Sequence, residues 1–447
     1  MNNILNQPIL VAGASGSLGR LVVSELLDTW HVPADQIIAT TRNPESLAEF
    51  AELGVVVREA DVNEPETLVK AFAGAKRMLI ISMPAAAPYR AGERFSKHKV
   101  LIEAAIEAGV EHIMYTSAPY SEPGTPCYVH FDHYNTEQFL INSGVNWTIL
   151  RHWEWPEIHF TDNWMLGVIN GEYYSCAGRG GMNLITRADC AKADAGALVS
   201  DVSVNRRFDI TGTAPQTADQ IMSMLSEISG KEIKVVHVTP EELPEYLSKN
   251  GTHPMFIPPL VSIGRGIRQG FYGGSTDAVE ELTGSKPESL RDYLYSQADI
   301  IRAGQSVSIF GDFASVDDEA MKDSVEKEAM PRDHEQEEQN KQIVSTYTQD
   351  LFNNHDISAV DRVVDAGVVQ HGVDIEDGAL ALKSFVIGEF QRYPELSLVV
   401  QHVAADGDSV FVHSCVKKDI DDKGDANVDI YRLHEGLIVE HWNVAQS

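Results

Sequence analysis

The sequence predicts an α/β protein with a doubly wound parallel sheet and a small substrate lobe, followed by a separate α+β unit with an antiparallel sheet. Three observations lead to this fold class. Short apolar segments alternate with segments of helical spacing in the first part of the chain, and this alternation becomes irregular after Thr148. A strongly acidic stretch then precedes a compact C-terminal pattern of helices and consecutive strands.

The first part of the chain predicts the parallel sheet. Apolar segments rich in β-branched residues predict strands at 8–12, 36–40, 55–58, 78–83 and 112–116. Segments of helical spacing lie between them at 19–30, 44–53, 64–72 and 95–108. A repeated strand–helix–strand pattern forms a parallel sheet with helices on both faces, and strands that are apolar on both sides fit that burial.

The segment after Thr148 predicts a lobe grown from the carboxyl side of the sheet. Further strands are expected at 148–151, 207–210 and 234–238, and helices at 218–229, 241–250, 259–269 and 286–303. We therefore expect residues 1–302 to form one domain.

The remaining residues predict a linker and a second domain. Residues 311–340 contain eleven Asp/Glu against three Lys/Arg, too little apolar surface to offset the entropy of ordering, so we expect an acidic linker over 303–337. A charged solvated helix is the alternative. In the domain expected at 338–447, helices are predicted at 341–353 and 379–393, and strands at 396–404, 409–417, 426–433 and 437–444, the last two joined by a tight turn.

Composition excludes several partners. With 35 Lys+Arg and 66 Asp+Glu the net charge is −31, which argues against nucleic acid and against an anionic membrane. Four widely spaced cysteines indicate reduced thiols and no metal site. No signal peptide is visible near the first residue, and the longest apolar segment, 78–87, is too short to span a bilayer. We expect a soluble cytoplasmic protein.

A glycine-rich loop between the first strand and the first helix predicts dinucleotide binding of the Rossmann type. Gly13 permits a tight turn, Gly16 lets the backbone approach a pyrophosphate, and Gly19 allows the helix to pack closely on the strand. The helix N-terminus would then face the phosphates. The residues expected at the phosphates are Gly13, Ser15, Gly16, Ser17, Leu18 and Gly19.

The end of the second strand predicts which cofactor is preferred. NAD sites usually carry an acidic residue near this position, whereas Arg42 offers a guanidinium group suited to the 2′-phosphate of NADPH. An exposed arginine at a strand end is the alternative. Asp61, after the third strand, is expected either to meet the adenine or to belong to the start of the next helix.

Residues 7–302 resemble the NmrA-like atypical short-chain dehydrogenase/reductases, and within them the NAD(P)H:quinone oxidoreductase branch. The resemblance is carried by the glycine spacing together with "TRNPESL", "READVNEPETL", "LIISMP", "YTSA", "TEQFL", "TILRHWEWPE", "ITRADCAKADAGAL" and "GGSTDAVEELTG". It implies a bound NADPH with the nicotinamide near Ser82, Met83, Thr116 and Ser117. Members of this family either reduce small acceptors such as quinones or act as redox sensors without turnover.

The chain lacks the Tyr-x-x-x-Lys pair of ordinary short-chain dehydrogenases, because Gln138 stands four residues after Tyr134. A quinone needs only a modest proton donor after hydride transfer, and the candidates are His133, Tyr134 and Tyr120. A structural role for His133 is the alternative. Ser117 is a further catalytic candidate that could hydrogen-bond the acceptor or the ribose; ordinary capping of the strand end is its alternative.

Aromatic residues follow the strand predicted at 148–151. His152, Trp153 and Trp155 stand at its carboxyl end, where α/β sheets bind ligands, and the two indoles could sandwich a planar substrate. Packing of the lobe is the alternative. Asp189, three residues after Thr186, is assigned to capping of a helix.

The C-terminal unit resembles the SnoaL-like, polyketide cyclase-like family of α+β cone fold, through "QHGVDIEDG", "YPELSLVVQHVAADGDSVFVHSCV" and "ANVDIYRLHEGLIVEHWNV". The resemblance implies an apolar pocket inside the cone with inward polar groups at His371, His413, Asp429 and Trp442. Asn443 stands where related sequences commonly carry Asp, which weakens an acid–base role.

Asp429 lies between Val428 and Ile430, and if it points inward, burial would make it a general acid or base with His413 as its partner. A buried acceptor for Arg432 or for a backbone amide is the alternative. The sequence as a whole predicts an NADPH-dependent reductase of a quinone-like or conjugated carbonyl small molecule, fused to a pocket domain that binds or converts the product. A non-catalytic NADPH sensor is the alternative, and a homo-oligomer is left open.

Overall fold

The computed structural model describes residues 7–84, 92–122, 125, 127, 130–160, 163–252, 257–304, 334–371, 377–419, 422–434 and 436–445. The chain divides into two compact units, Met1–Asp312 and Phe313–Ser447. Most of the linker predicted over 303–337 lies outside the described residues, at 305–333. The helix α16 (His334–Thr348) begins within the last residues of that predicted linker.

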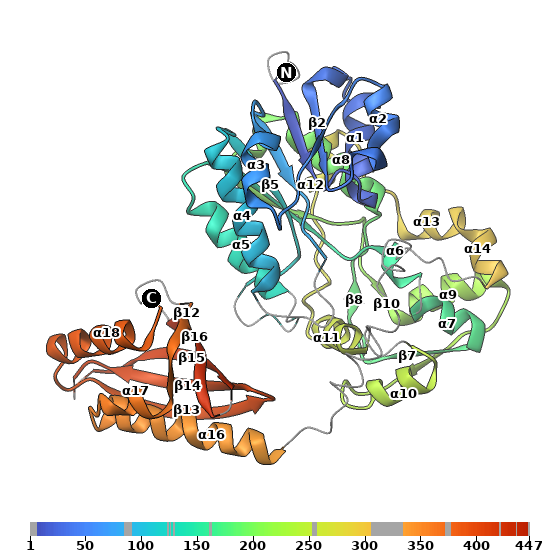
Figure 1. Cartoon of the computed structure of the whole chain (residues 1–447). Coiled ribbons are helices and arrows are strands. Elements are labelled where there is room, and N and C mark those ends of the chain that lie inside the picture. Colours follow the sequence, from blue (N-terminus) through green and yellow to red (C-terminus); the bar gives the residue numbers. More distant parts are fainter. Residues whose placement is uncertain are drawn as a thin grey trace. The chain divides into compact units, whose positions relative to one another are not determined.

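The first unit contains a seven-stranded sheet in the order β3-β2-β1-β4-β5-β6-β9, and every neighbouring pair in it is parallel (Figure 1). Its strands are β1 (Ile9–Ala12), β2 (Ile37–Thr41), β3 (Val56–Glu59), β4 (Arg77–Ile80), β5 (His112–Ser117), β6 (Asn146–His152) and β9 (Arg206–Ile210). The strands that follow β1 are thus added on both sides of it, with β2 and β3 on one side and β4, β5, β6 and β9 on the other. The predicted doubly wound parallel sheet is confirmed.

Helices cover both faces of this sheet (Figure 1). Successive strand residues enter opposite cores: Ile9 and Val11 pack with one set of helices, and Leu10 and Ala12 with the other. This explains why the strands are apolar on both sides. One face carries α1 (Ser17–Asp28), α8 (Arg187–Leu198) and α12 (Ala278–Thr283), and the other carries α3 (Pro65–Phe72), α4 (Glu93–Glu107) and α5 (Phe131–Ile141).

The lobe is built from two small sheets and short helices. Strand β7 (Glu172–Ser175) pairs in parallel with β11 (Lys234–His237), and β8 (Gly181–Met182) pairs antiparallel with β10 (Gln216–Thr217). The helices of the lobe are α6 (Pro156–His159), α7 (Asn163–Asn170), α9 (Ala218–Ser229), α10 (Leu243–Lys249), α11 (Ile257–Arg268), α13 (Leu290–Ser296) and α14 (Ala298–Ala303). The short helix α2 (Ala48–Glu52) belongs to the sheet region.

The helix predicted over 286–303 is in fact two helices. The chain leaves helical geometry at Gln297, where φ is −94° and ψ is 11°. The break lets α14 turn so that Ile301 is fully buried in the lobe core. Local spacing could not reveal this, because the change of direction is set by the core that Ile301 enters.

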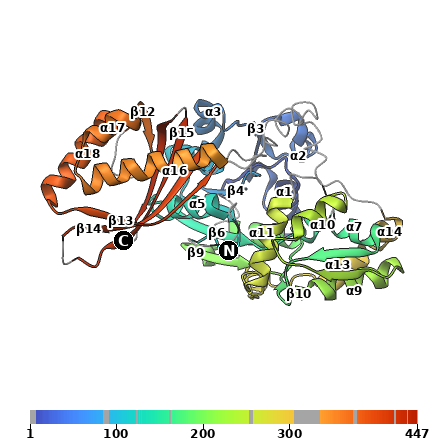
Figure 2. The ribbon, with the colours of Figure 1, turned by 90° about the horizontal axis from the view of Figure 1, so that it is seen from below.

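The second unit contains a five-stranded sheet in the order β12-β16-β15-β14-β13. Its strands are β12 (Val364–Gln370), β13 (Ser397–Asp406), β14 (Ser409–Lys417), β15 (Asp425–His434) and β16 (Leu437–Ala445). Helix α16 lies across the concave sheet (Figure 2), with a π-helical turn at Gln349–Asn353, and α17 (Ser358–Val363) and α18 (Ala379–Arg392) complete the unit. Strand β12, which pairs in parallel with β16, was not predicted from the sequence.

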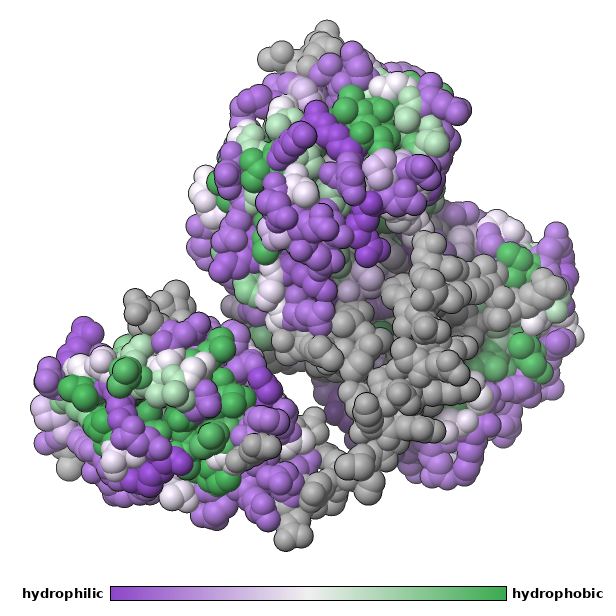
Figure 3. All heavy atoms as spheres, in the orientation of Figure 1, coloured by the Kyte–Doolittle hydropathy of each residue, from purple (hydrophilic) through white to green (hydrophobic). Residues whose placement is uncertain are grey.

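The visible surfaces of the two units differ in hydropathy. Figure 3 shows mainly hydrophilic residues over the visible face of the first unit, and hydrophobic residues gathered on the visible face of the second. Among the described residues, none of the helices combines the length and the apolar character needed to cross a membrane.

Candidate functional site

The glycine loop has the geometry of a phosphate cradle. Gly13 adopts φ +82°, and the Gly16 amide donates to the Gly13 carbonyl oxygen at 3.1 Å. A Cβ on Gly19 would lie 2.3 Å from that same oxygen, so only glycine permits this close approach of α1 to β1. The N-cap residue Gly16 provides no side-chain cap, so the first amides of α1, at Ser17 and Leu18, are left for an external anion. The loop fits a pyrophosphate.

Neighbouring side chains hold the loop in this shape. Thr41 donates from Oγ1 to the Ser15 hydroxyl at 2.9 Å, and Arg20 donates from Nε to the Ser15 carbonyl oxygen at 3.1 Å. Arg20 also pairs with Glu49 and with the Ser46 carbonyl oxygen. Because Arg20 is bound in this way, it is not free to serve as the 2′-phosphate ligand.

Arg42 and Asp61 both lie at the carboxyl edge of the sheet beside this loop. Arg42 directly follows β2 and is exposed to solvent. Asp61 follows β3 and accepts from the Asn63 backbone amide at 2.9 Å and from the Asn63 side chain at 3.0 Å. It does not cap the next helix, because the N-cap of α3 is Glu64.

The residues expected at the nicotinamide are connected to one another across β4 and β5. The Ser82 amide donates to Thr116 Oγ1 at 2.8 Å, and Thr116 returns its own proton to Ser82 Oγ at 3.3 Å. The Met83 amide donates to His98 Nε2 at 3.1 Å. The backbone at the end of β4 is therefore held by side chains from β5 and α4.

His133 lies in a buried polar cluster at the same edge. Its Nδ1 is 2.7 Å from the hydroxyl of Tyr115, which in turn lies 3.2 Å from His98 Nδ1. Burial, followed by the nearby Arg94 and neighbouring histidines, lowers the pKa of His133 well below its usual value. His133 is therefore neutral at pH 7. Tyr134, about 100° further round α5, is partly exposed.

Glu137, one turn after His133, is a fully buried carboxylate that ties α5 to three strands. Ser117 donates to its Oε1 at 2.6 Å, and Arg151 makes a two-pronged contact at 2.8 Å to each oxygen. Arg207 adds a contact of 3.2 Å. Since the Ser117 proton is already donated to Glu137, Ser117 could only accept a hydrogen bond from a ligand, not donate one.

The predicted aromatic sandwich after β6 is wrong. Trp153 is only 4% exposed, its indole donates to Asp209 Oδ1 at 3.1 Å, and its ring packs against the backbone of Gly274. His152 is also buried, with Nε2 2.8 Å from Asp194 Oδ1. Both side chains belong to the core, and the local sequence cannot distinguish a core residue from one that faces a ligand.

Trp155 and Tyr120 remain partly exposed. The Arg187 guanidinium lies 4.7 Å from the Trp155 ring centre. Tyr120 adopts φ +49° and contacts Trp153 and Phe271 by its ring, so a turn at the end of β5 sets its direction. Thr186 caps α8 by accepting from the Asp189 amide at 3.1 Å, so the structural assignment of Asp189 is confirmed.

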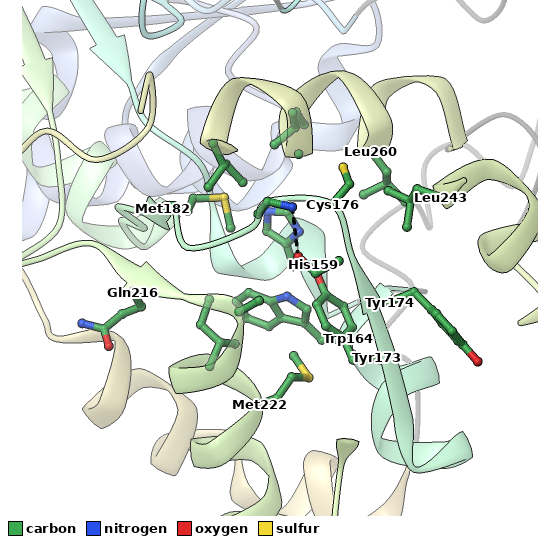
Figure 4. Close-up of a pocket in the computed structure, with 18 of the residues that line it drawn as sticks. His159, Trp164, Tyr173, Tyr174, Cys176, Met182, Gln216, Met222, Leu243 and Leu260 are labelled. Carbon is green, nitrogen blue, oxygen red and sulfur yellow. Dashed lines mark hydrogen bonds between the residues drawn. The ribbon is translucent and has the colours of Figure 1, made fainter. Parts of the chain in front are cut away.

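The lobe contains a cavity of about 50 Å³ between β7, α9 and α11 (Figure 4). Its wall includes His159, stacked on Trp164 at 5.0 Å between ring centres, and the buried thiol of Cys176. For comparison, an engineered protein cavity that binds benzene has a volume of about 150 Å³. The lobe cavity as it stands is therefore too small for an aromatic substrate, and none of the predicted substrate-binding residues line it.

In the second unit, Asp429 lies on the inner face of the sheet. It is 4% exposed, and three donors converge on its carboxylate: His441 Nε2 at 3.0 Å, Asn443 Nδ2 at 2.7 Å and Asn427 Nδ2 at 2.7 Å. The other nitrogen of His441 lies 2.9 Å from Gln370 Oε1. The His441 imidazole is thus held between Asp429 and Gln370.

Two tyrosines line this inner face beside Asp429 and His441. Tyr431 stacks on the His441 ring with 4.7 Å between centres, and Tyr347 meets Tyr431 edge-on. Burial and the neighbouring Asp429 charge raise the pKa of both hydroxyls, so both stay protonated at neutral pH. Aromatic rings and hydrogen-bonded polar groups therefore share this face.

The expectation that His413, His371 and Trp442 point into the cone is wrong. Val412 pairs opposite Asp429, and because side chains alternate along a strand, His413 faces the other side, with the exposed Phe411. Trp442 likewise alternates with His441, and it stacks with His371 at 4.4 Å on the outer face. The sequence showed which side chains share a face of each strand, but it did not show which face points into the cone.

Sequence reasoning missed several residues of both sites. Tyr115 lies in the quoted segment "YTSA" but was given no role there, and His98 lies in a predicted helix with no motif. His441 was overlooked although it alternates with Asn443, a signal that could have found it. Gln370 was out of reach because β12 itself was not predicted.

Comparison with known proteins identifies both units. A family model described as NAD(P)H-binding matches residues 13–193, and one described as SnoaL-like domain matches residues 344–441. The structure is similar to the Citrobacter sp. triphenylmethane reductase solved with NADP(H), at 33% identity and TM-score 0.59, over 65% of this chain and 99% of that chain.

Curated relatives agree with this assignment. Quinone oxidoreductase 2 of Escherichia coli is 28% identical over 64% of this chain and 96% of its own length. The NmrA-like family domain-containing oxidoreductase flvB of Aspergillus flavus is 25% identical over 63% of this chain and 92% of its own length. Fold and phosphate loop define an NAD(P)H-dependent Rossmann oxidoreductase. The chain belongs to the NmrA-like family and carries a C-terminal SnoaL-like domain.

The exposed Arg42 generates a prediction about cofactor preference. The Arg42→Ala variant should bind NADPH roughly ten- to a hundredfold more weakly and bind NADH almost unchanged, because one charge-assisted hydrogen bond of about 1.5–3 kcal/mol is lost. Fluorescence titration with both cofactors measures this, with Arg291→Ala, an exposed arginine in α13, as the control. Equal affinity of the unaltered protein for NADPH and NADH would contradict the prediction.

The His152–Asp194 pair generates a prediction about stability. Burial alone would lower the pKa of His152, but the charge of Asp194, with Cys190 beside it, raises it well above the usual value. Removing one partner of a buried pair costs about 3–5 kcal/mol, so Asp194→Asn should be strongly destabilised. Because the pKa of His152 is raised in the folded protein, its pair with Asp194 should stabilise the wild-type protein fully at about pH 6. This stabilisation, which Asp194→Asn lacks, should decrease as alkaline pH deprotonates His152.

Denaturant unfolding at about pH 6 and about pH 9 measures this difference. The exposed Asp219, paired with the exposed His237, provides the control, since Asp219→Asn should cost less than about 1 kcal/mol at either pH. A loss for Asp194→Asn that does not change with pH would show that His152 is not charged in the folded protein.

Proposed function

We propose that the first unit reduces a quinone-like or conjugated carbonyl small molecule with NADPH, and that the SnoaL-like unit binds or further converts the product. One observation carries the first half: the phosphate loop and the buried, neutral His133 lie at the same carboxyl edge of the sheet. This edge is where open α/β sheets bind ligands. Two of the relatives are named quinone oxidoreductase and triphenylmethane reductase, and quinones and triphenylmethane dyes are both conjugated acceptors.

The residues of the first unit suit such an acceptor. NADPH, when bound, supplies a hydride. The chain has no Tyr-x-x-x-Lys pair to protonate an ordinary alkoxide, and a hydroquinone anion requires less help because its charge is delocalised. His133 as a hydrogen-bond donor to the reduced oxygen, and Tyr120 and Trp155 as contacts for the ring, would be sufficient. Tyr134, partly exposed, stays a secondary candidate.

The test is NADPH oxidation over a panel of quinones and triphenylmethane dyes, followed under anaerobic conditions together with the reduced product. Steady turnover with one reduced acceptor per NADPH is expected. Gly19→Ala should abolish it, because the added Cβ would lie 2.3 Å from the Gly13 carbonyl oxygen and close the phosphate cradle. Tight NADPH binding without turnover on any acceptor would favour the alternative, a redox sensor.

For the second unit, the arrangement around Asp429 favours a division of roles. Its carboxylate lies within hydrogen-bond distance of three side chains, so it is suited to orienting His441. Both ring nitrogens of His441 are engaged, Nε2 by Asp429 and Nδ1 by Gln370, so His441 could exchange a proton with a ligand only if that ligand displaced Gln370. The fully buried Ser414 hydroxyl and the amide nitrogen of Gln370 have no hydrogen-bond partner among the described residues, and a polar ligand in the cone could provide one.

We predict that Asp429→Asn, which keeps the shape and removes the charge, leaves NADPH oxidation by the first unit unchanged. It should eliminate conversion of the reduced product if the cone is catalytic, or weaken ligand binding without changing the product if the cone only binds. Mass spectrometry of products and thermal melts measure these outcomes. The control is Asp425→Asn, on the same strand but exposed and paired with Lys418. An unchanged product profile with full ligand affinity would remove Asp429 from the site.

A further inference from the structure

A continuous line of hydrogen bonds connects the backbone at the end of β4 to His133. The Met83 amide donates to His98 Nε2 at 3.1 Å. A neutral imidazole has one protonated nitrogen, so accepting at Nε2 places the proton of His98 on Nδ1. His98 is neutral because burial, with the nearby Arg94, lowers its pKa to about 3.

The Nδ1–H of His98 faces two hydroxyl oxygens, Thr136 Oγ1 at 3.1 Å and Tyr115 OH at 3.2 Å. Thr136 uses its own proton on the Asp132 carbonyl oxygen at 2.7 Å, so its oxygen acts as an acceptor. The Tyr115 proton is free to point to His133 Nδ1, 2.7 Å away. The donor directions along the line therefore agree with one another, and His133 receives a hydrogen bond at Nδ1.

We propose that His98 and Tyr115 are positioning residues that hold His133 in one neutral tautomer, with its Nε2–H kept as a hydrogen-bond donor for the substrate oxygen that gains negative charge during reduction. This inference rests on the proposed reductase function. The hydride brings two electrons and one hydrogen to the substrate, and the resulting anion takes its proton from solvent. His133 stabilises the anion and transfers no proton of its own, which is the function of a preorganised donor.

The surroundings of His133 keep the ring neutral across the working pH range. The charged and titratable groups near it are Arg94 and His98 on α4, Tyr115 on β5, His130 and Asp132 at the start of α5, and His152 on β6. Tyr115 is fully buried, which raises the pKa of its hydroxyl and keeps the proton it must donate. A protonated His133 would lie close to Arg94, so the neutral ring is favoured.

Nitrogen-15 NMR of histidine-labelled protein without cofactor tests the tautomer directly. His133 is expected to carry its proton on Nε2 alone between about pH 6 and about pH 9, and Tyr115→Phe should produce a mixture of tautomers. Tyr293→Phe, which removes a partly buried hydroxyl in the lobe, should leave the His133 signals unchanged. A wild-type His133 that is protonated at Nδ1, or that titrates in this range, would overturn the inference.

Kinetics test the role. Tyr115→Phe should lower kcat roughly ten- to a hundredfold with NADPH affinity unchanged, and His133→Gln should lower it by about 10²–10³-fold, as for a lost oxyanion donor. His98→Gln can still accept from Met83 and donate to Tyr115, so it should retain kcat within a few fold, whereas His98→Leu should not. Equal losses in both His98 variants, or an unchanged kcat in Tyr115→Phe, would contradict the positioning role.

The two levels of failure are distinguishable. If the unaltered protein reduces no acceptor, the proposed function fails, and the donor role of His133 fails with it. If the protein turns over normally but Tyr115→Phe scrambles the tautomer without slowing the reaction, only this inference fails. If Tyr115→Phe instead loses NADPH binding, thermal stability and turnover together, the hydroxyl is structural and the inference is also overturned.

Discussion

The candidate active site depends on the hydrogen bonds and ion pairs that the buried Glu137 carboxylate makes. This carboxylate binds Ser117 on β5, Arg151 on β6 and Arg207 on β9, and so fixes the rotation of α5 against the sheet. Burial alone would lower the pKa of Arg151, but its contacts with Glu137 raise it, so the guanidinium remains charged. Because His133 lies one turn before Glu137, the same contact sets where the imidazole points. An unpaired carboxylate at this depth would be strongly destabilising.

Each unit holds a histidine in place with neighbouring side chains. In the first, burial keeps His133 neutral and a tyrosine fixes its donor direction. In the second, Asp429 and Gln370 hold His441 from both sides beneath a stacked Tyr431. In each case neighbouring side chains orient a histidine. Such outer partners determine the orientation and tautomer of the group that does the chemistry.

The alternation of strands and helices and the glycine spacing were sufficient to predict the parallel sheet and the phosphate loop, because both depend on local rules. Gly13, with φ +82°, and Gly19, where a Cβ would lie 2.3 Å from the Gly13 carbonyl oxygen, each met a requirement that no other residue satisfies as well, whereas Gly16 has the ordinary φ of −69°. The two-domain pattern and the antiparallel sheet of the second unit followed from periodicity in the same way. Strand β12 was missed because its polar residues and Gly367 weaken the strand signal.

The sequence by itself determined the fold class and the dinucleotide loop, and it placed Asp429 among apolar residues of a strand in the second unit. Only the tertiary structure decided which side of each strand faced inward, and so replaced His413 by His441 as the partner of Asp429. It also buried Trp153 and His152 and joined His98, Tyr115 and His133 from three separate segments. The physical reason is that periodicity fixes how side chains alternate, whereas burial and contact depend on the elements packed against them.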